Sequence, residues 1–315
     1  MSQPLRVALV GCGRLGEVGY VPALAAAAGV TLVAVAERDP QRRARVGALA
    51  GVPAFPDATE LLARVPVDGL VLATPVGARL AEATAASAAG VALLIEKPPA
   101  QDRAGAARLA QLAPPPWVGF NRRFSPATQR LQEAVSPGGQ VLVDLELRYR
   151  RGGWGAHTAT DDALLDLGPH LIDLARWLTR AEVVAVRRAT VLPERAELEL
   201  LLGEDRHARA RLRCATDRPH AERFAVRDRK GHTLAAARTG GLASGAWQRL
   251  LTRRRPHPLT ASLTAQVEAF ARAARGAPEP TLGRAADGVA VMAVVDAARA
   301  CAAAGGRLTT ITTEE

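Results

Sequence analysis

Short apolar runs alternate with helix-length, alanine-rich segments over the first 120 residues. This alternation is typical of βα units that build a parallel sheet. Segments 14–28 and 78–89 have high helical propensity, and each is followed by a glycine, Gly29 or Gly90, that suits the left-handed residue closing a helix. The predicted strands are residues 5–10, 31–36, 69–73, 91–95 and 117–120. The N-terminal half is therefore predicted to be a doubly wound α/β domain.

After residue 120 the pattern changes to strict alternation, most clearly in residues 141–149. Val141, Val143, Leu145, Leu147 and Tyr149 share one face there, and charged residues share the other. A sheet with one apolar and one polar face is typically antiparallel. Further strands are predicted at 183–191, 196–202, 208–214, 223–228 and 232–237, helices at 262–274 and 285–303, and a surface excursion at 240–258. Two domains follow, 1–120 and 121–315, the second an α+β domain around an open, mainly antiparallel sheet.

The chain of 315 residues carries a formal net charge of +10. Of its 41 basic residues, only Lys97 and Lys230 are lysines. The positive charge is scattered rather than clustered, which argues against a nucleic-acid partner and favours a small anionic or nucleotide-linked molecule. No stretch reaches the ~18 apolar residues that a membrane span needs, so no membrane partner is expected.

Cysteine usage bears on the compartment. Cys12, Cys214 and Cys301 are few and widely spaced, which disfavours a disulfide framework and a cysteine-based zinc site. The histidines show no metal-ligand spacing, so no metal is expected. The N-terminus lacks the parts of an export signal. These features together predict a cytoplasmic protein.

The first predicted strand leads into Gly11-Cys12-Gly13-Arg14-Leu15-Gly16, a G-x-G-x-x-G between a strand and a helix. Gly11 permits the tight turn, Gly13 lets the backbone approach a diphosphate, and Gly16 lets the helix pack on the strand. Arg14 and Leu15 open a helix whose N-terminus favours an anion. A flexible glycine turn is the alternative, but the position of the motif favours a dinucleotide-binding Rossmann domain.

The end of the second strand bears on cofactor choice. Glu37 lies about twenty residues beyond the glycines, where an acidic side chain accepts hydrogen bonds from ribose hydroxyls, so NAD is favoured. Arg38, with Arg42 and Arg43 nearby, could instead bind a 2′-phosphate, which leaves NADP as the alternative.

Three residues are candidates for catalysis. Lys97 follows the fifth predicted strand, at the sheet edge where open α/β folds bind ligands. Pro169 is expected near the first turn of a helix, with His170 at its start and Asp166 on the same face if the helix extends back that far. A carboxylate at that spacing could orient and tune a histidine general base. Read alone, Lys97 could be a surface lysine, Asp166 a helix cap and His170 a packing residue.

Together these motifs resemble the Gfo/Idh/MocA oxidoreductase family. The resemblance rests on the glycine loop, Ala73-Thr74-Pro75, Glu96-Lys97-Pro98 and the D-x-G-x-H-x-x-D run from Asp166 to Asp173. It implies a Rossmann domain followed by an open antiparallel sheet that often mediates oligomerisation, here a homodimer or homotetramer. It also implies Lys97, Asp166 and His170 as the catalytic set, Thr74, Pro75 and Glu96 along the cofactor, and Asn121 with Arg122 near the substrate.

The chain departs from the family pattern at two places. Arg79 stands where the family commonly has a histidine, and Asp161-Asp162-Ala163 stands where it commonly has glycines. Trp154 lies in a stretch that could form a rim of the substrate pocket or an ordinary solvent loop.

The predicted activity is reversible, NAD(P)-dependent hydride transfer to or from a secondary alcohol or ketone of a sugar, nucleotide-sugar or cyclitol. In this hypothesis His170 moves the hydroxyl proton, Lys97 stabilises the charge on the same oxygen, and Asp166 orients His170 or a neighbouring hydroxyl. One alternative is the reduction of an imine or keto intermediate of specialised metabolism. A dinucleotide-binding protein without turnover is an alternative of another class.

Overall fold

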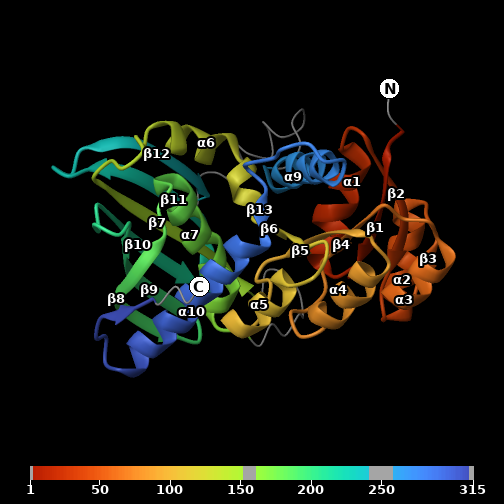
Figure 1. Ribbon diagram of the computed structural model, residues 1–315, viewed down its shortest axis with the longest axis horizontal. Coiled ribbons are helices and arrows are strands. Elements are labelled where there is room, and N and C mark those ends of the chain that lie inside the picture. Colours follow the sequence, from red (N-terminus) through yellow and green to blue (C-terminus); the bar gives the residue numbers. More distant parts are fainter. Residues whose placement is uncertain (1–2, 152–160, 241–257, 312–315) are drawn as a thin grey trace. The chain divides into compact units, whose positions relative to one another are not determined.

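A computed structural model describes residues 3–151, 161–240 and 258–311, and Figure 1 shows the order of the elements. The chain divides into two compact units. The first is Met1–Phe124 with Pro256–Val289, and the second is Ser125–Arg255 with Ala290–Glu315. This differs from a single boundary at residue 120, because the chain returns to the first unit near its C-terminal end. The returning segment supplies a helix and an edge strand to that unit.

The first unit is built on a seven-stranded sheet with the strand order β13-β6-β5-β4-β1-β2-β3. All pairs are parallel except β13 with β6. The strands are β1 (Leu5–Val10), β2 (Val30–Ala36), β3 (Ala54–Phe55), β4 (Gly69–Leu72), β5 (Ala92–Glu96), β6 (Trp117–Gly119) and β13 (Gly283–Arg284). All five predicted strands are present. The short β3 and β13 were not predicted, because two residues carry no alternation to detect.

Helices connect these strands. They are α1 (Val21–Ala26), α2 (Pro40–Ala50), α3 (Ala58–Arg64), α4 (Arg79–Ala88), α5 (Arg103–Ala110), the 3₁₀ turn η2 (Asn121–Phe124) and α9 (Pro258–Ala274). The helix predicted over residues 14–28 contains a π-helical turn, η1 (Gly16–Tyr20), in which the Val21 amide donates to the Gly16 carbonyl. Pro22 follows directly and has no amide hydrogen, so the regular ladder is interrupted at this point.

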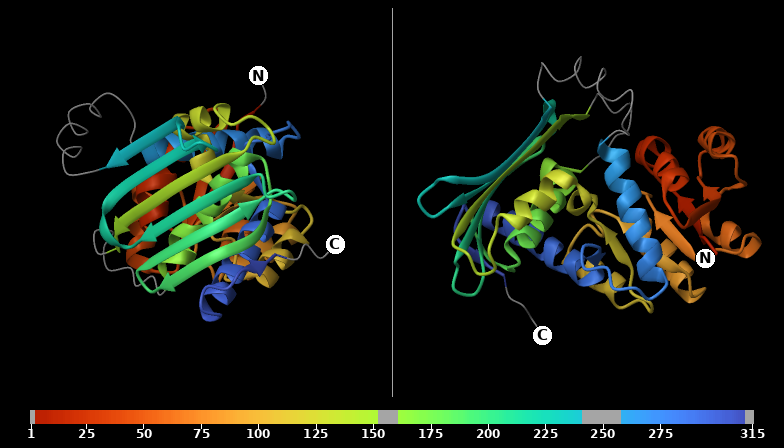
Figure 2. Two further views of the ribbon diagram at one scale, coloured as in Figure 1. Left: turned by 90° about the vertical axis from the view of Figure 1, so that its left-hand side faces the viewer. Right: turned by 90° about the horizontal axis from the view of Figure 1, so that it is seen from above.

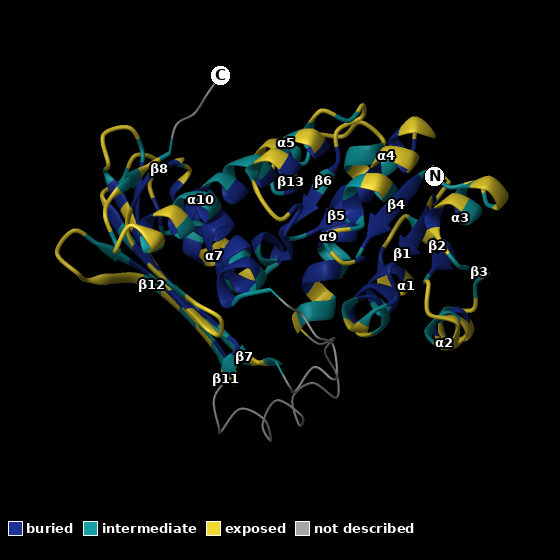
Figure 3. Ribbon diagram, turned by 90° about the horizontal axis from the view of Figure 1, so that it is seen from below, coloured by how far each residue is buried: buried dark blue, intermediate teal, exposed yellow. Residues whose placement is uncertain are grey.

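The core of the first unit combines residues from both of its chain segments. Val7 and Leu9 from β1 belong to one buried cluster with Tyr20, and with Val267 and Phe270 from α9. Strand β4 and most of β5 are dark blue in Figure 3 because they are buried on both faces. That is the pattern of a parallel sheet covered by helices, which explains their continuous apolar sequence.

The second unit holds a seven-stranded sheet with the order β12-β11-β7-β10-β9-β8-β14. The pairs are antiparallel except β10 with β7, which is parallel. The strands are β7 (Val141–Arg150), β8 (Val183–Leu192), β9 (Arg195–Leu202), β10 (Ala208–Ala215), β11 (Asp217–Asp228), β12 (Thr233–Gly240) and β14 (Thr309–Thr310). The predicted fold class, a Rossmann-type domain plus a mainly antiparallel sheet domain, is confirmed.

Helices α6 (Pro126–Glu133) and α7 (Ala163–Thr179) also belong to the second unit, and the division between the units falls within α10 (Ala285–Ala303). Helix α7 packs against β7, β9 and β10. Val143, Leu145 and Leu147 of β7 are buried, as the alternation predicted. Among the described residues the other face of this sheet carries no helix, and Figure 2 shows it turned toward the viewer. The predicted excursion at 240–258 lies almost wholly outside the described residues.

Candidate functional site

The glycine loop joins β1 to the helix at η1, and its three glycines have different surroundings. Gly11 has φ +92°, and a Cβ added there would lie 2.6 Å from the carbonyl carbon of Ala73. A Cβ on Gly16 would lie 2.3 Å from the carbonyl oxygen of Gly11. A Cβ on Gly13 would have no neighbour within 4 Å. Gly11 and Gly16 are thus required by the packing of the protein itself, whereas Gly13 leaves the backbone open to a ligand.

The start of the helix completes this loop. Arg14 is exposed and Leu15 is half-buried, and the Glu17 amide makes the first turn by donating to the Gly13 carbonyl at 2.9 Å. An open backbone beside a helix N-terminus fits an anionic group such as the diphosphate of a dinucleotide. The residues present therefore fit the predicted cofactor.

Glu37, just past the end of β2, lies against the glycine loop. Its carboxylate accepts hydrogen bonds from the Cys12 amide at 2.9 Å and the Asp39 amide at 3.1 Å. The Arg42 guanidinium lies 3.6 Å from the same carboxylate. Arg38 is exposed. A carboxylate fixed here suits ribose hydroxyls, and its negative charge opposes a 2′-phosphate.

The carboxyl ends of β4 and β5 bring Thr74, Pro75, Glu96 and Lys97 to one edge of the sheet. Thr74 is buried and its hydroxyl donates to Glu82 at 2.5 Å, whereas Pro75 is exposed. Lys97 is half-buried, and its amide donates to the Glu96 carboxylate at 3.0 Å. These predicted cofactor and catalytic residues therefore belong to one hydrogen-bonded edge.

Glu96 belongs to a buried hydrogen-bond network. Its Oε1 accepts from the Tyr20 hydroxyl at 2.5 Å, and that hydroxyl accepts from Gln266 Nε2 at 3.1 Å. Burial raises the pKa of Glu96, and Lys97 and the Tyr20 hydrogen bond oppose the shift. Burial also raises the pKa of Tyr20 well above its ordinary value, and the Glu96 charge adds to the effect. Tyr20 is therefore a proton donor that holds Glu96 in one orientation.

Asn121 and Arg122, predicted near the substrate, both belong to η2. Asn121 is buried and its side-chain amide donates to Ser262 Oγ of α9 at 3.1 Å, so it also joins the two chain segments of the first unit. Arg122 is half-buried. The neighbouring Arg123 is buried, 3.2 Å from the Asp287 carboxylate.

In the second unit α7 carries Asp166 and His170. The expectation that Pro169 lies near the first turn was wrong, because Asp162 caps the helix by accepting from the Leu165 amide at 2.7 Å and α7 begins at Ala163. Pro169 is therefore inside the helix, and Asp166, in the first turn, is not the capping residue. Asp166 and His170 are both half-buried and lie four residues apart on this helix.

Two residues of β7 and the segment after it contact Asp166. The Tyr149 hydroxyl donates to Asp166 Oδ2, and Arg151 Nη2 lies 3.4 Å from the same oxygen. Arg151 also donates to the Asp161 carbonyl at 2.6 Å. Burial raises the pKa of Tyr149, and the Asp166 charge adds to the rise. Asp166 is thus held from the sheet as well as from its own helix.

No role in the site was predicted from the sequence for Tyr20, Tyr149, Arg151 or Gln266. The sequence offered one signal, which is that the chain has two tyrosines. In the structure each tyrosine hydroxyl donates to the carboxylate of a predicted site residue. Trp154 lies outside the described residues. Lys97 belongs to the first unit and Asp166 and His170 belong to the second.

The described ranges hold neither a cluster of potential metal ligands nor a helix that could cross a membrane. Within residues 3–151, 161–240 and 258–311, no three histidine, cysteine, aspartate or glutamate side chains are grouped as metal ligands would be. No helix in these ranges combines the length and apolar character of a membrane span.

Comparison with known proteins finds a family model that matches the N-terminal part of the chain. Residues 5–115 match the model of the GFO_IDH_MocA oxidoreductase family, described as an NAD-binding Rossmann fold. An inositol 2-dehydrogenase of Acidothermus cellulolyticus is 28% identical over 267 residues, which cover 73% of this chain and 78% of the relative.

Solved structures match the whole fold. GenD2 from gentamicin A biosynthesis, in complex with NAD, has a TM-score of 0.81 at 24% identity and covers 99% of this chain and 98% of its own. The scyllo-inositol dehydrogenase of Lactobacillus casei, with bound NAD(H) and scyllo-inositol, has a TM-score of 0.80 at 18% identity. The match covers 98% of this chain and 99% of that protein. At these identities the likeness concerns the fold.

Proposed function

We propose that this chain, which belongs to the Gfo/Idh/MocA oxidoreductase family, catalyses NAD-dependent hydride transfer to or from a secondary carbinol carbon of a cyclitol or related polyol. The observation that carries the proposal is the carboxyl edge of the first sheet. There an open glycine backbone, at Gly13, and a lysine, Lys97, occupy the edge where α/β folds bind ligands. The name of the inositol 2-dehydrogenase relative supports the substrate class.

The glycine loop and Glu37 would hold the cofactor, with Arg14, Leu15, Thr74, Pro75 and Glu96 along it. NAD, when bound, supplies C4 of its nicotinamide as the hydride acceptor. Glu37 favours NAD over NADP because its carboxylate would repel a 2′-phosphate.

Lys97, Asp166 and His170 would carry the proton chemistry. His170 takes the proton from the substrate hydroxyl as a general base, and Lys97 donates a hydrogen bond to the same oxygen while negative charge develops on it. Asp166, held by Tyr149 and Arg151, orients His170 or a neighbouring substrate hydroxyl. Asn121, Arg122 and Trp154 would line the substrate side.

The first experiment is calorimetric titration of nucleotide-free protein with NADH and with NADPH. We expect tight binding of NADH and weaker binding of NADPH; binding of neither would overturn the proposal. Lys97→Met should then cut turnover severely while NADH affinity stays nearly unchanged. The chain offers a matched control, since Lys230→Met removes the other lysine, from the second unit.

A substrate panel separates this proposal from its rivals. Turnover of myo-inositol, scyllo-inositol and related polyols with NAD supports the cyclitol class. Turnover confined to nucleotide-sugars, simple ketones or imines moves the chain to another substrate class of the same family. Tight NADH binding with no turnover of any panel member, under conditions where a known dehydrogenase is active, indicates a binding protein without catalysis.

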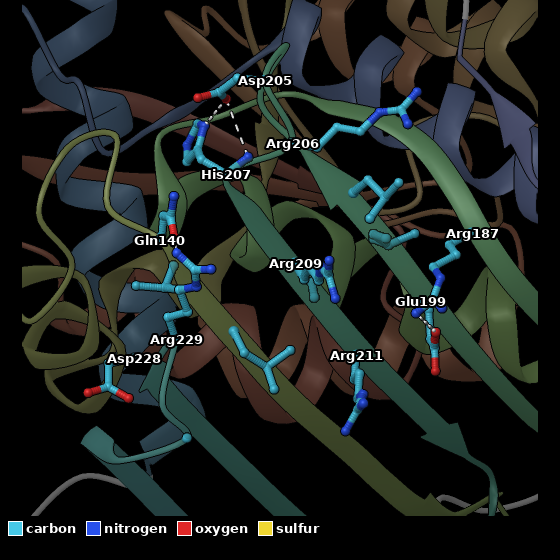
Figure 4. Close-up of a pocket in the computed structure, with 16 residues that line it drawn as sticks. Gln140, Arg187, Glu199, Asp205, Arg206, His207, Arg209, Arg211, Asp228 and Arg229 are labelled. Carbon is cyan, nitrogen blue, oxygen red and sulfur yellow. Dashed lines mark hydrogen bonds and ion pairs between the residues drawn. The ribbon is translucent and has the colours of Figure 1, made fainter.

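We also propose that the chain forms a homo-oligomer, a dimer or a tetramer, through the bare face of the second sheet. That face carries charges in columns: Arg211 and Arg213 on β10 lie between Glu199 and Glu197 on β9 and Asp144 and Glu146 on β7. Part of this face forms a hollow of about 510 Å³ in which arginines predominate, shown in Figure 4. A two-fold axis between β10 and β7 would set the basic column of each copy against an acidic column of the other.

Light scattering after size-exclusion chromatography tests this interface. Arg211→Glu should lower the mass from that of an oligomer toward that of the monomer, and adding Asp144→Arg should restore it. Arg108→Glu, on an exposed position of α5, is the control and should leave the mass unchanged. A wild-type chain that is monomeric at micromolar concentration contradicts the proposal.

A cytoplasmic location is proposed on the state of the thiols. Cys12, Cys214 and Cys301 are all buried, and none forms a disulfide with another. Burial, with the nearby Glu37 charge, raises the pKa of Cys12 to about 12, which keeps this thiol protonated and unreactive. Localisation of a tagged chain in its native host tests the proposal, and recovery outside the cytoplasm would overturn it.

A further inference from the structure

Arg79, the first residue of α4, is 6% exposed and points its guanidinium at backbone carbonyls. Its Nε donates to the Thr74 carbonyl at 2.9 Å, and its Nη1 donates to the carbonyls of Glu96 and Pro98. Thr74 follows β4 and Glu96 ends β5, so one side chain connects the ends of two adjacent strands. Burial of a charge is unfavourable unless the charge is well hydrogen-bonded. The Arg79 guanidinium meets this condition by donating to backbone carbonyls.

The acceptors of Arg79 lie on both sides of Lys97. The Glu96 carbonyl precedes Lys97 and the Pro98 carbonyl follows it. The Lys97 amide is held as well, because it donates to Glu96 Oε2 at 3.0 Å. The backbone around Lys97 is therefore fixed at three points by side chains of its own unit.

The first turn of α4 also fixes the neighbouring loop. Glu82, three residues after Arg79, accepts from the Thr74 hydroxyl at 2.5 Å, while Arg79 binds the Thr74 carbonyl. Both strand ends are thus held against the same turn of helix. A planar guanidinium can serve several carbonyls at fixed angles, whereas a lysine ammonium at this place presents a single point on a flexible stem.

We propose that Arg79 is a positioning residue for Lys97, fixing the backbone from which the Lys97 side chain extends and so controlling the rate of the reaction without touching the substrate. The proposal rests on the proposed function of Lys97. It gives a physical meaning to the arginine that stands at a position where the family pattern has a histidine.

The kinetic test compares Arg79→Lys, Arg79→Ala and the control Arg108→Ala, using the best polyol of the substrate panel with NAD. Misplacement by about 1 Å can cost about a hundredfold in rate, so we expect kcat to fall about tenfold to a hundredfold in Arg79→Ala. NADH affinity should fall by a smaller factor than kcat, because these Arg79 hydrogen bonds reach the backbone beside Lys97 and at Thr74. Guanidinium ion should restore part of the lost kcat in Arg79→Ala, and urea, which has a similar shape without charge, should not.

A double-mutant cycle separates positioning from general structural support. If Arg79 acts through Lys97, then Arg79→Ala should lower kcat little further in a Lys97→Met background. An equal fold-loss in both backgrounds would overturn the positioning role. Full activity of Lys97→Met alone would instead overturn the proposed function, so the two failures are distinguishable.

A cofactor-free measurement gives an independent readout. The chain contains two lysines, so reductive methylation with a ¹³C label gives one NMR resonance from Lys97 and one from Lys230, besides that of the N-terminal amine. In Arg79→Ala and in the more conservative Arg79→Gln, neither of which adds a lysine, the Lys97 resonance should shift and sharpen as its backbone is released, while that of Lys230 stays in place. A Lys97 resonance identical to that of the wild type, in both variants of Arg79, would overturn the proposal.

Discussion

Gly13→Val is the substitution that most directly separates cofactor binding from folding. Because a Cβ at Gly13 meets no atom within 4 Å, valine should fit the folded protein without a clash. Gly13 also lies outside the left-handed region, so a side chain causes no backbone strain there. We expect the free energy of unfolding to change by no more than about 0.5 kcal/mol, as for an ordinary surface substitution. Urea denaturation measures this change.

The loss in binding should be much larger. In a loop of this kind the open backbone donates to the diphosphate, and a hydrogen bond to a charged group contributes about 1.5–3 kcal/mol. An isopropyl group in that space would push the diphosphate away and remove about two such bonds, or about 3–6 kcal/mol. At about 1.4 kcal/mol per tenfold, NADH affinity should fall at least a hundredfold, as calorimetric titration would measure.

Gly16→Ala is the matched control. Its Cβ would lie 2.3 Å from the Gly11 carbonyl oxygen, so this smaller change should lower the free energy of unfolding where Gly13→Val does not. If Gly13→Val binds NADH as tightly as the wild type, the cofactor does not approach the backbone at Gly13 and the reasoning fails.

Three further changes test other parts of the first unit. Glu37→Ser removes the carboxylate beside Arg42, so the ratio of NADPH to NADH affinity should rise at least tenfold; an unchanged ratio in calorimetry would contradict the role of Glu37. Tyr20→Phe removes the donor to Glu96 and the acceptor for Gln266, and should lower the free energy of unfolding in urea by about 1–3 kcal/mol, with no loss refuting the network. Because burial raises the folded-state pKa of Glu96 above 4.5, its contribution to stability is complete below that pH and declines as pH rises through the folded value. Glu96→Gln should therefore flatten the wild-type fall in unfolding free energy above pH 4.5, and parallel pH curves for the two proteins would count against it.

The elements that the sequence predicted best are those whose pattern follows from burial. Strand β4 is a continuous apolar run, and β1 is one apart from Arg6, because helices cover both faces, whereas β7 alternates because one face of its sheet is bare. The start of α7 was misjudged because Pro169 resembles a first-turn proline, whereas the true cap, Asp162, is an ordinary acidic residue in a polar stretch. Local propensity alone does not decide which of these two residues marks the start of the helix.

The sequence predicted which residues of the site lie at strand ends. It did not predict which of these residues contact one another. That Lys97 follows β5 can be read from periodicity. That Arg79 reaches the carbonyls of Glu96 and Pro98 depends on the angle at which α4 packs on the sheet, which is a tertiary property. Gln266 is 246 residues from its partner Tyr20, and no local pattern connects them.

The return of the chain to the first unit bears on how this protein is made. Val267 and Phe270 of α9 are fully buried with Tyr20 in the core of that unit, and β13 adds its edge strand. During synthesis the ribosome releases residues 1–124 long before residues 256–289 emerge. The first unit therefore waits, with the apolar surface that α9 will cover still exposed, while the whole sheet of the second unit except β14 is being translated. A stop codon anywhere before α9 therefore leaves an incomplete core.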